Sequence, residues 1–258
     1  MNMSRREALS GLGCLAVVAT SELLAAPESL APKKAPALPW AYAILDPQHV
    51  AKRAYENYFS HHCMYASFEA IIGELADKFG EPYSSFPFDM MAYGSGGVAG
   101  WGSLCGTLNG AAAAIQLVSH RPEEIIAELF RWYETTPIPN VNLTILTDET
   151  SKYPQPIKVK PSISHSVLCH VTISKWVKES GKSLDSVEKS QRCAQAAASV
   201  AKKSVELLNA EKNGTLVFTH QTSSEIESCI KCHSGATSRM KDTQGKMDCL
   251  SCHAGHGK

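Results

Sequence analysis

The sequence lacks an excess of charge of either sign. Its 25 lysine and arginine side chains match 25 aspartate and glutamate side chains over 258 residues, and no basic stripe or polybasic run is present. Nucleic acids and anionic membrane surfaces are bound mainly by clustered positive charge. We therefore expect no nucleic-acid partner. The length suffices for one or two domains with a hydrophobic core.

The chain also lacks a hydrophobic run long enough to span a membrane. The apolar run at 8–20 is short, follows Arg5 and Arg6, and is followed by small residues suited to cleavage. This pattern predicts an export signal at 1–26 that resembles a twin-arginine signal, and hence a periplasmic protein without a membrane span. Residues 27–46 contain four prolines and are expected to form a weakly ordered spacer.

Signatures of common enzyme classes are missing as well. The glycine run at 94–97 follows no predicted strand and precedes no Lys-Ser or Lys-Thr pair, so a tight bend is expected there rather than a phosphate-binding loop. No nucleophile–base set stands out. The sequence therefore gives no support for a nucleotide site at this loop or for nucleophilic catalysis.

The C-terminal segment carries the clearest motifs, two copies of C-x-x-C-H. The first is Cys229, Cys232 and His233, and the second is Cys249, Cys252 and His253. In a c-type cytochrome the two thiols add to the vinyl groups of a haem, and the following histidine ligates the iron. We expect two haem c groups, with His233 and His253 as proximal ligands.

A zinc site is the competing interpretation of these cysteines. Sixteen residues separate Cys232 from Cys249, which also fits the spacing of a zinc ribbon. A zinc ribbon does not require a histidine after each cysteine pair, and c-type haem is attached outside the bacterial cytoplasm. The histidines and the predicted export signal therefore favour haem.

Helical patterns dominate the region between the spacer and the haem motifs. Expected helices cover 47–79, 101–118, 122–134 and 163–178, and a last one runs from a cap at Ser183 or Asp185 to about 210. Residues 136–162 should form a connection with an extended piece at 141–146. The predicted fold is mainly α, with a helical cysteine-bearing domain at 47–212 and a small, irregular dihaem segment at 213–258.

Four further cysteines, Cys63, Cys105, Cys169 and Cys193, each fall in a different expected helix. Their spacing leaves three interpretations open. They are buried thiols, two disulfides formed after export, or four thiolate ligands of iron or an iron–sulfur cluster. Spacing alone ranks the disulfides first.

A resemblance changes that ranking. Residues 62–64, the glycine-rich loop and residues 104–110 resemble the redox-active family known by its C-GCAxxG-C-C pattern, with Cys169 and Cys193 as the later cysteines. The chain departs from the pattern in having His62-Cys63-Met64 where the family has Gly-Cys-Ala. This domain followed by two haem motifs resembles the split-Soret cytochromes c over 47–258.

The resemblance implies an exported electron carrier of anaerobic bacteria. Members are homodimers with two bis-histidinyl haems per subunit, and one axial histidine of each haem comes from the other subunit. It also implies a non-haem iron centre, iron–sulfur in kind, at Cys63, Cys105, Cys169 and Cys193. Independently, a segment of 46 residues rarely builds a core around two haems, so they must pack on the helical domain or on a second subunit.

The distal haem ligands are predicted from position. His220 and His256 lie in the haem segment, and His256 is too close to His253 to reach the same iron, so it would reach the neighbouring haem or the partner subunit. His165 and His170 come next, and Met240 and Met247 are competing ligands. We expect a carrier with saturated haems and unknown redox partner proteins. A small reductase with an open iron site is the alternative, and a zinc-ribbon protein without redox function is a third.

Overall fold

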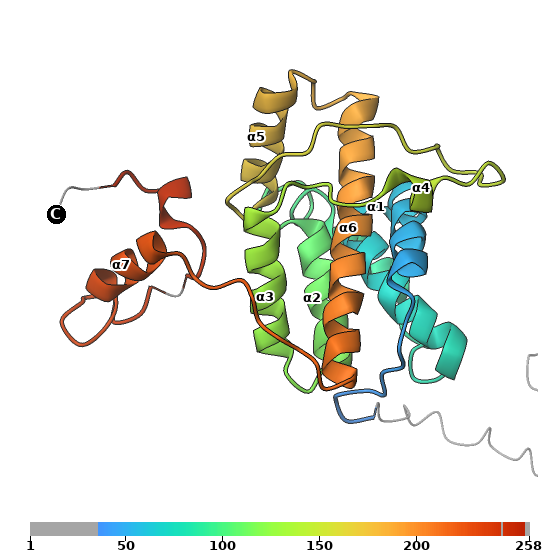
Figure 1. Ribbon diagram of the computed structural model, residues 1–258, viewed down its shortest axis with the longest axis horizontal. Helices are drawn as coiled ribbons and strands as arrows, with labels where there is room; N and C mark the ends of the chain where they lie inside the picture. The colour runs from blue at the N-terminus through green and yellow to red at the C-terminus, as the bar shows by residue number, and fades with distance from the viewer. Residues whose placement is uncertain (1–35, 244, 256–258) are drawn as a thin grey trace, which may run out of the picture. The chain divides into compact units, whose positions relative to one another are not determined.

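The computed structural model describes residues 36–243 and 245–255. The predicted export signal at 1–26, the first part of the spacer at 27–46 and the predicted ligand His256 lie outside the described residues. The fold is mainly α, as predicted (Figure 1). Within the described ranges there is no sheet, only two isolated β-bridges. None of the helices described is both long enough and apolar enough to cross a membrane.

The first helix, α1, covers Pro47–Phe79, as predicted. The Asp46 carboxylate accepts a hydrogen bond of 2.9 Å from the backbone N–H of Gln48, and the proline that follows Asp46 has no N–H to satisfy. Gly80 ends the helix with a φ of 67°, a conformation that costs glycine little because it has no Cβ.

A kink divides α1 in two. His61 and His62 have non-helical backbone angles, and His62 has a φ of 64°, which is uncommon for a residue with a Cβ. The helical hydrogen-bond ladder is interrupted here. Cys63 consequently becomes the first residue of the second half of α1, where the helical N–H groups lack intrahelical partners.

The next two helices are η1 and α2. The loop after α1 contains the 3-10 helix η1 at Phe88–Gly94. Helix α2 covers Gly106–Val118, so the predicted start at 101 was wrong by five residues. Residues just before α2 are extended because they pair with the chain ahead of α5, as Leu104 does with Leu168. Cys105 therefore precedes α2 instead of lying inside it.

Small residues let α1 and α2 approach closely. A Cβ at Gly110 would lie 2.2 Å from the carbonyl oxygen of Met64 and 2.5 Å from Oγ of Ser67. Ser67 in turn donates a 2.8 Å hydrogen bond to the carbonyl of Thr107. The backbones of the two helices are therefore nearly in contact close to Cys63 and Cys105.

Helix α3 covers Pro122–Thr135, as predicted, and the connection after it contains the single turn α4 at Leu143–Leu146. The predicted extended piece at 141–146 was wrong. The side chain of Asn142 accepts a 3.0 Å hydrogen bond from the N–H of Thr144, and this cap starts a helical turn.

Helix α5 covers Cys169–Ser180, so its predicted start at 163 was also wrong. Serine side chains form hydrogen bonds with backbone groups that would pair within the helix if α5 began earlier. Ser164 Oγ donates 2.7 Å to the carbonyl of Ser166, and Ser166 Oγ accepts 3.1 Å from the N–H of Leu168. His165 lies in this turn, with a φ of 53°, ahead of the helix.

The longest unbroken helix is α6 at Val187–Lys212. Its cap is Ser186, not the predicted Ser183 or Asp185. Ser186 Oγ accepts from the N–H of Lys189 at 3.2 Å, whereas Ser183 Oγ donates to Asp185. The C-terminal segment then contains α7 at Ser224–His233 and the 3-10 turn η2 at Cys249–Ser251.

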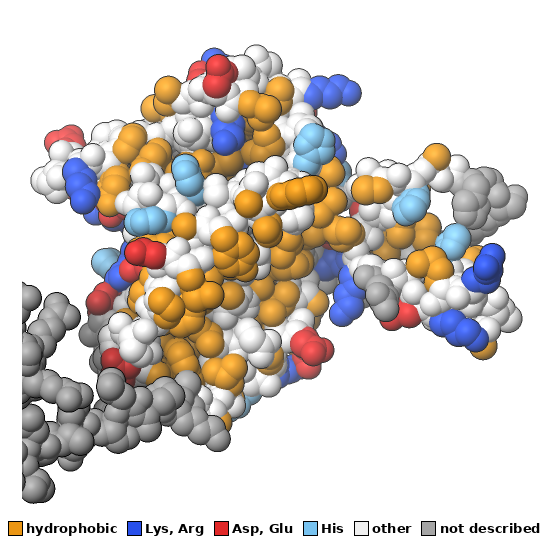
Figure 2. All heavy atoms as spheres, turned by 180° about the vertical axis from the view of Figure 1, so that it is seen from behind, with side chains coloured by type: hydrophobic (Ala, Val, Ile, Leu, Met, Phe, Trp, Pro, Cys, Tyr) orange, Lys and Arg blue, Asp and Glu red, His pale blue; other side chains and the backbone are white. Residues whose placement is uncertain are grey.

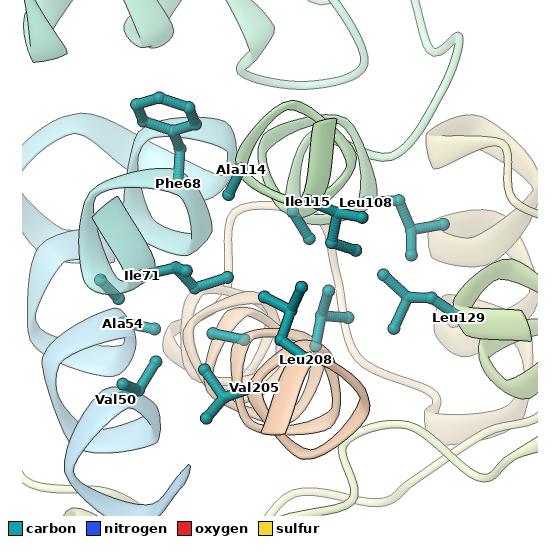
Figure 3. Close-up of a cluster of buried hydrophobic side chains, with 14 of the residues drawn as sticks. Val50, Ala54, Phe68, Ile71, Leu108, Ala114, Ile115, Leu129, Val205 and Leu208 are labelled. Carbon is teal, nitrogen blue, oxygen red and sulfur yellow. The ribbon is translucent and has the colours of Figure 1, made fainter. Parts of the chain in front are cut away.

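The core lies where α1, α2, α3 and α6 meet, and Figure 3 shows side chains from all four pointing inward. Ile71 of α1, Ile115 of α2, Leu129 of α3 and Leu208 of α6 lie together in this cluster, and Phe68 of α1, which belongs to the same cluster, points away from these four. All five are 0–1% exposed. This packing holds the starts of α2 and α5 and the kink of α1 in fixed positions.

Candidate metal centre and haem segment

Two of the four domain cysteines are brought together by backbone pairing. The N–H of Cys105 donates 2.9 Å to the carbonyl of Val167, and the N–H of Cys169 donates 2.7 Å to the carbonyl of Ser103. Around the Leu104–Leu168 bridge this is an antiparallel pairing. Side chains alternate along such segments, so Cys105 and Cys169 lie on the same face as diagonal neighbours.

Cys63 can approach Cys105 and Cys169 because residue 106 is a glycine. A Cβ at Gly106 would lie 2.4 Å from Cys63 Sγ and 2.6 Å from the carbonyl oxygen of Gly94. Only a residue without a side chain allows the Cys63 thiol to lie against the start of α2. The kink at His62 turns the chain so that Cys63 points here.

Cys193 completes the set from the second turn of α6. The four cysteines predicted as ligands, with Arg192, line one cavity of about 20 Å³, which is room for roughly one water-sized atom. Cys105 is buried and the other three are partly exposed. Three helices and the residue just before α2 therefore bring four thiols to one small cavity that has no space for an organic substrate.

No disulfide joins any of the eight cysteines in the described ranges. Within those ranges, no three histidine, cysteine or acidic side chains converge on one point as a metal ion would require. The thiols surround the cavity, and small rotations about Cα–Cβ would be needed to bring them onto a common group. The structure thus gathers the cysteines without fixing their coordination.

The thiols of Cys63 and Cys169 are protonated when nothing is bound. Burial, followed by the neighbouring Cys105 and Cys193, raises the pKa of Cys63 to about 12, because thiolates repel one another. Burial, followed by the same two neighbours, raises the pKa of Cys169 to about 12. A bound cation would reverse this, because a coordinating thiol loses its proton. The donor set therefore fits iron, which thiolates bind.

Sequence reasoning missed two residues at this cavity, Arg192 and Tyr133. Arg192 is 1% exposed, and its Nε and Nη2 have no hydrogen-bond partner. Tyr133 is fully buried and donates a 3.5 Å hydrogen bond to Cys105 Sγ. The only signal in the sequence was an arginine directly before Cys193, at the start of an alanine-rich stretch.

The haem motifs lie in α7 and η2. Cys229, Cys232 and His233 occupy the last turn of α7, while Cys249 begins η2 and Cys252 and His253 follow its first turn. Cys232, Cys252 and both histidines are exposed. Burial and contact with Cys229 raise the pKa of Cys249, so one thiol of each motif lies beside the other motif.

Helix α3 binds the chain just ahead of α7 through Glu128, which is 2% exposed. Both oxygens of Glu128 accept from the N–H of Thr219 at 3.1 Å, Oε2 accepts from the N–H of His220 at 3.0 Å, and Oε1 lies 2.7 Å from Nδ1 of His220. One turn along, Arg131 Nη2 donates 3.4 Å to Thr222. These contacts fasten the predicted ligand His220.

The tautomer of His220 follows from the charge of Glu128. Burial raises the pKa of Glu128, but hydrogen bonds from His220 and Thr219 outweigh burial, and the net shift is downward. An ionised carboxylate can only accept, so Nδ1 of His220 must carry a proton and donate it. Nε2 is then the ring nitrogen available to a metal. Sequence patterns did not single out Glu128.

The remaining histidines considered as ligands lie near the start of α5. His170 is exposed, and its N–H donates 3.1 Å to the carbonyl of Gly102. The carbonyl of His165 accepts a 3.0 Å hydrogen bond from Ser251 Oγ of η2. Met240 and Met247 are exposed. His165 is thus linked to the second haem motif through its backbone.

Comparisons with known proteins agree with this arrangement. Residues 65–207 match the family described as "Putative redox-active protein (C_GCAxxG_C_C)", a range that contains Cys105, Cys169 and Cys193 and begins two residues after Cys63. The split-Soret cytochrome c of Desulfovibrio desulfuricans is 35% identical over 99% of this chain and 96% of its own.

A solved structure of that cytochrome, described as containing a novel iron centre, is also similar. It has a TM-score of 0.76 and 34% identity, and covers 84% of this chain and 91% of its own. A helical cysteine domain joined to two haem motifs defines a redox cytochrome of the c type. The chain belongs to the split-Soret cytochrome c family, as the resemblance predicted.

Proposed function

We propose that the protein is an exported, periplasmic dihaem cytochrome that carries electrons between redox partner proteins. Its second redox group is a non-haem iron centre, an iron–sulfur cluster, held by Cys63, Cys105, Cys169 and Cys193. The observation that carries this proposal is the gathering of four thiols at one cavity, three from helices and one from the residue just before α2. The iron centre described for the similar solved structure supports it.

The two haems are attached at the C-terminal motifs. Cys229 and Cys232 hold the first, Cys249 and Cys252 hold the second, and His233 and His253 are the proximal ligands. The contact between Cys229 and Cys249 supports neighbouring haems, because it brings one attachment point of each motif to the other. Bound haem supplies the one-electron chemistry.

His220 is proposed as a distal ligand, and its geometry supports this role. Its proton is held on Nδ1 by Glu128, the arrangement in which a carboxylate orients a metal-binding histidine. His256 remains the prediction for the second haem. Because α3 holds His220 against the helical domain, the haem bound by His220 must lie against that domain. That haem belongs either to the same chain or to a partner.

A homodimer with exchanged axial histidines is part of the proposal. The haem segment exposes large apolar side chains, Val217 at 68%, Met240 at 61% and Leu250 at 54%. Trp101, in the glycine-rich loop, is 86% exposed, and Figure 2 shows hydrophobic side chains gathered over one face of the molecule. Apolar area of this extent is typical of an interface. Sedimentation of the haem-loaded protein should give twice the subunit mass.

The test of the iron centre is total iron measured against covalent haem in anaerobically purified protein. We expect two haems per chain and iron in clear excess of haem. Iron equal to haem would remove the proposed centre and leave a two-haem carrier with buried thiols. A colourless protein containing zinc would overturn the haems as well.

The role as carrier, rather than as a reductase with an open iron, is tested with carbon monoxide. Bis-histidine haems have no free coordination position, so the reduced protein should keep its absorption spectrum when the gas is added. The small volume of the cysteine cavity supports the carrier. Rapid formation of a carbon monoxide complex at either haem would favour the reductase.

A further inference from the structure

Arg192 is a buried cation without an anionic partner. It lies on α6 with 1% of its surface exposed, and Nε and Nη2 donate to nothing in the described part of the chain. A guanidinium keeps its proton at any pH at which proteins fold. Burying such a charge without an anion is strongly destabilising, so a fold that retains the charge must supply the anion from a bound group.

The groups around Arg192 belong to the cysteine cavity. Tyr133, to which it is hydrogen-bonded, and the sulfurs of Cys193 and Cys105 interact with its charge, and both cysteines line the same cavity as Arg192. None of the ion pairs found in the described ranges involves it, whereas the other buried arginine, Arg131, pairs with Glu134 at 3.0 Å. An anion that neutralises Arg192 would therefore lie in this cavity.

Helix starts add to the positive potential at the same cavity. Cys105 immediately precedes α2 and Cys169 is the first residue of α5, and neither helix start has a side-chain cap. Cys63 begins the second half of α1. Uncapped helix N-termini favour negative charge. Three helix starts and one unpaired guanidinium thus face a cavity lined by sulfur.

We propose that Arg192 is the built-in counter-ion of the metal centre, and that the group held by the four cysteines is an anionic metal–thiolate assembly. This inference rests on the proposed function. Four thiolates carry more negative charge than one or two bound ferric or ferrous ions with their bridging sulfides neutralise. Arg192 then serves as a positioning residue, with its free N–H groups directed at the sulfurs.

The sign of its effect on the centre follows from electrostatics. Reduction adds a negative charge to an assembly that is already anionic, and a nearby cation stabilises the reduced form more than the oxidised form. Hydrogen bonds to the sulfurs act in the same direction. Arg192 should therefore raise the reduction potential of the non-haem centre without affecting the haems.

The experiment uses the full, haem-loaded protein with three substitutions. Arg192→Met removes the charge and the donors, Arg192→Lys keeps the charge with different donors, and Lys212→Met is a control at the exposed end of the same helix. The midpoint potential of each centre is measured by redox titration. We expect a lower non-haem potential in R192M, an intermediate value in R192K and unchanged haem potentials in all three.

A second measurement does not depend on redox chemistry. Thermal stability is compared before and after a chelator removes the non-haem iron. Wild type should lose more stability than R192M, because removing the centre leaves Arg192 buried without an anion only in wild type. If R192M does not fold, the rate of iron loss to the chelator is compared between wild type and R192K, and the altered donors of R192K should make its iron loss faster.

The outcomes separate the two proposals. If wild type contains non-haem iron and R192M matches its potential and its stability loss, the role of Arg192 is overturned and the centre stands. The same holds if R192K matches both the potential and the rate of iron loss of wild type. A wild-type protein without iron beyond its haems would overturn the centre and the counter-ion together.

Discussion

Nδ1 of His220 lies 2.7 Å from Oε1 of Glu128, a carboxylate that is almost completely buried in α3. The same carboxylate accepts the backbone N–H groups of Thr219 and His220. One residue therefore orients both the backbone and the ring of a predicted haem ligand. Because the hydrogen bond gives the imidazole more anionic character, it should strengthen electron donation to an iron at Nε2.

The first prediction concerns Glu128→Gln. An amide can still bond to the ring but carries no charge, so His220 becomes a weaker donor and the ferric form is less stabilised. We expect the potential of one haem to rise by about 60 mV for each tenfold loss of ferric affinity relative to ferrous affinity. A spectroelectrochemical titration measures it. Glu123→Gln, an exposed site on the same helix, is the control. Equal shifts in both variants would contradict the predicted role.

The second prediction separates the two kinds of iron. Cys105→Ser removes one of the cavity thiols, so we expect loss of the non-haem iron with both haems retained. Cys249→Ala removes one attachment point of the second haem, so we expect less covalent haem with the non-haem iron retained. Iron and haem are determined on the same sample. Full non-haem iron in C105S would exclude Cys105 as a ligand.

Local patterns predicted much of the fold. The periodicity and caps of α1 and α3 gave their bounds, and the doubled haem motif was evident without a structure. The starts of α2 and α5 were placed too early because they depend on pairing between Cys105 and Val167 and between Ser103 and Cys169, which are more than 60 residues apart. Periodicity within one segment carries no information about such contacts.

The surroundings of the candidate sites were harder to predict than their ligands. Glu128 lies on an amphipathic helix, where a glutamate normally faces water, and its burial depends on the chain 90 residues later. Arg192 likewise has no local feature that predicts burial. The spacing of the cysteines identifies the candidate ligands. The residues that modify the properties of those ligands become evident only from the packing of distant helices.

The third prediction tests the reactivity of the cavity after iron is removed. Since the pKa of Cys63 and that of Cys169 are both raised to about 12, each thiol stays protonated at pH 8 in the folded, iron-free protein. An unperturbed thiol has a pKa of about 8.5, so alkylation should be slower by roughly a thousandfold than in the unfolded chain. The rate should rise tenfold per pH unit towards pH 12. Peptide mass spectrometry after timed alkylation checks this, and rapid labelling at pH 8 without unfolding would refute it.

The last prediction concerns Gly106, the residue that lets Cys63 reach the cavity. In Gly106→Ala the new Cβ would lie 2.4 Å from Cys63 Sγ and 2.6 Å from the carbonyl of Gly94, so the thiol or α2 must shift. We expect loss of the non-haem iron and a destabilisation of about 1–3 kcal/mol from overpacking.

Gly181→Ala is the control. Gly181 ends α5 with a φ of 70° and has no atom near its Cβ position, so alanine there should cost about 1–2 kcal/mol through backbone strain alone. Iron content and thermal unfolding are measured for both. Iron retained in G106A, or lost equally in G181A, would mean that the close approach of Cys63 to α2 is not what assembles the site.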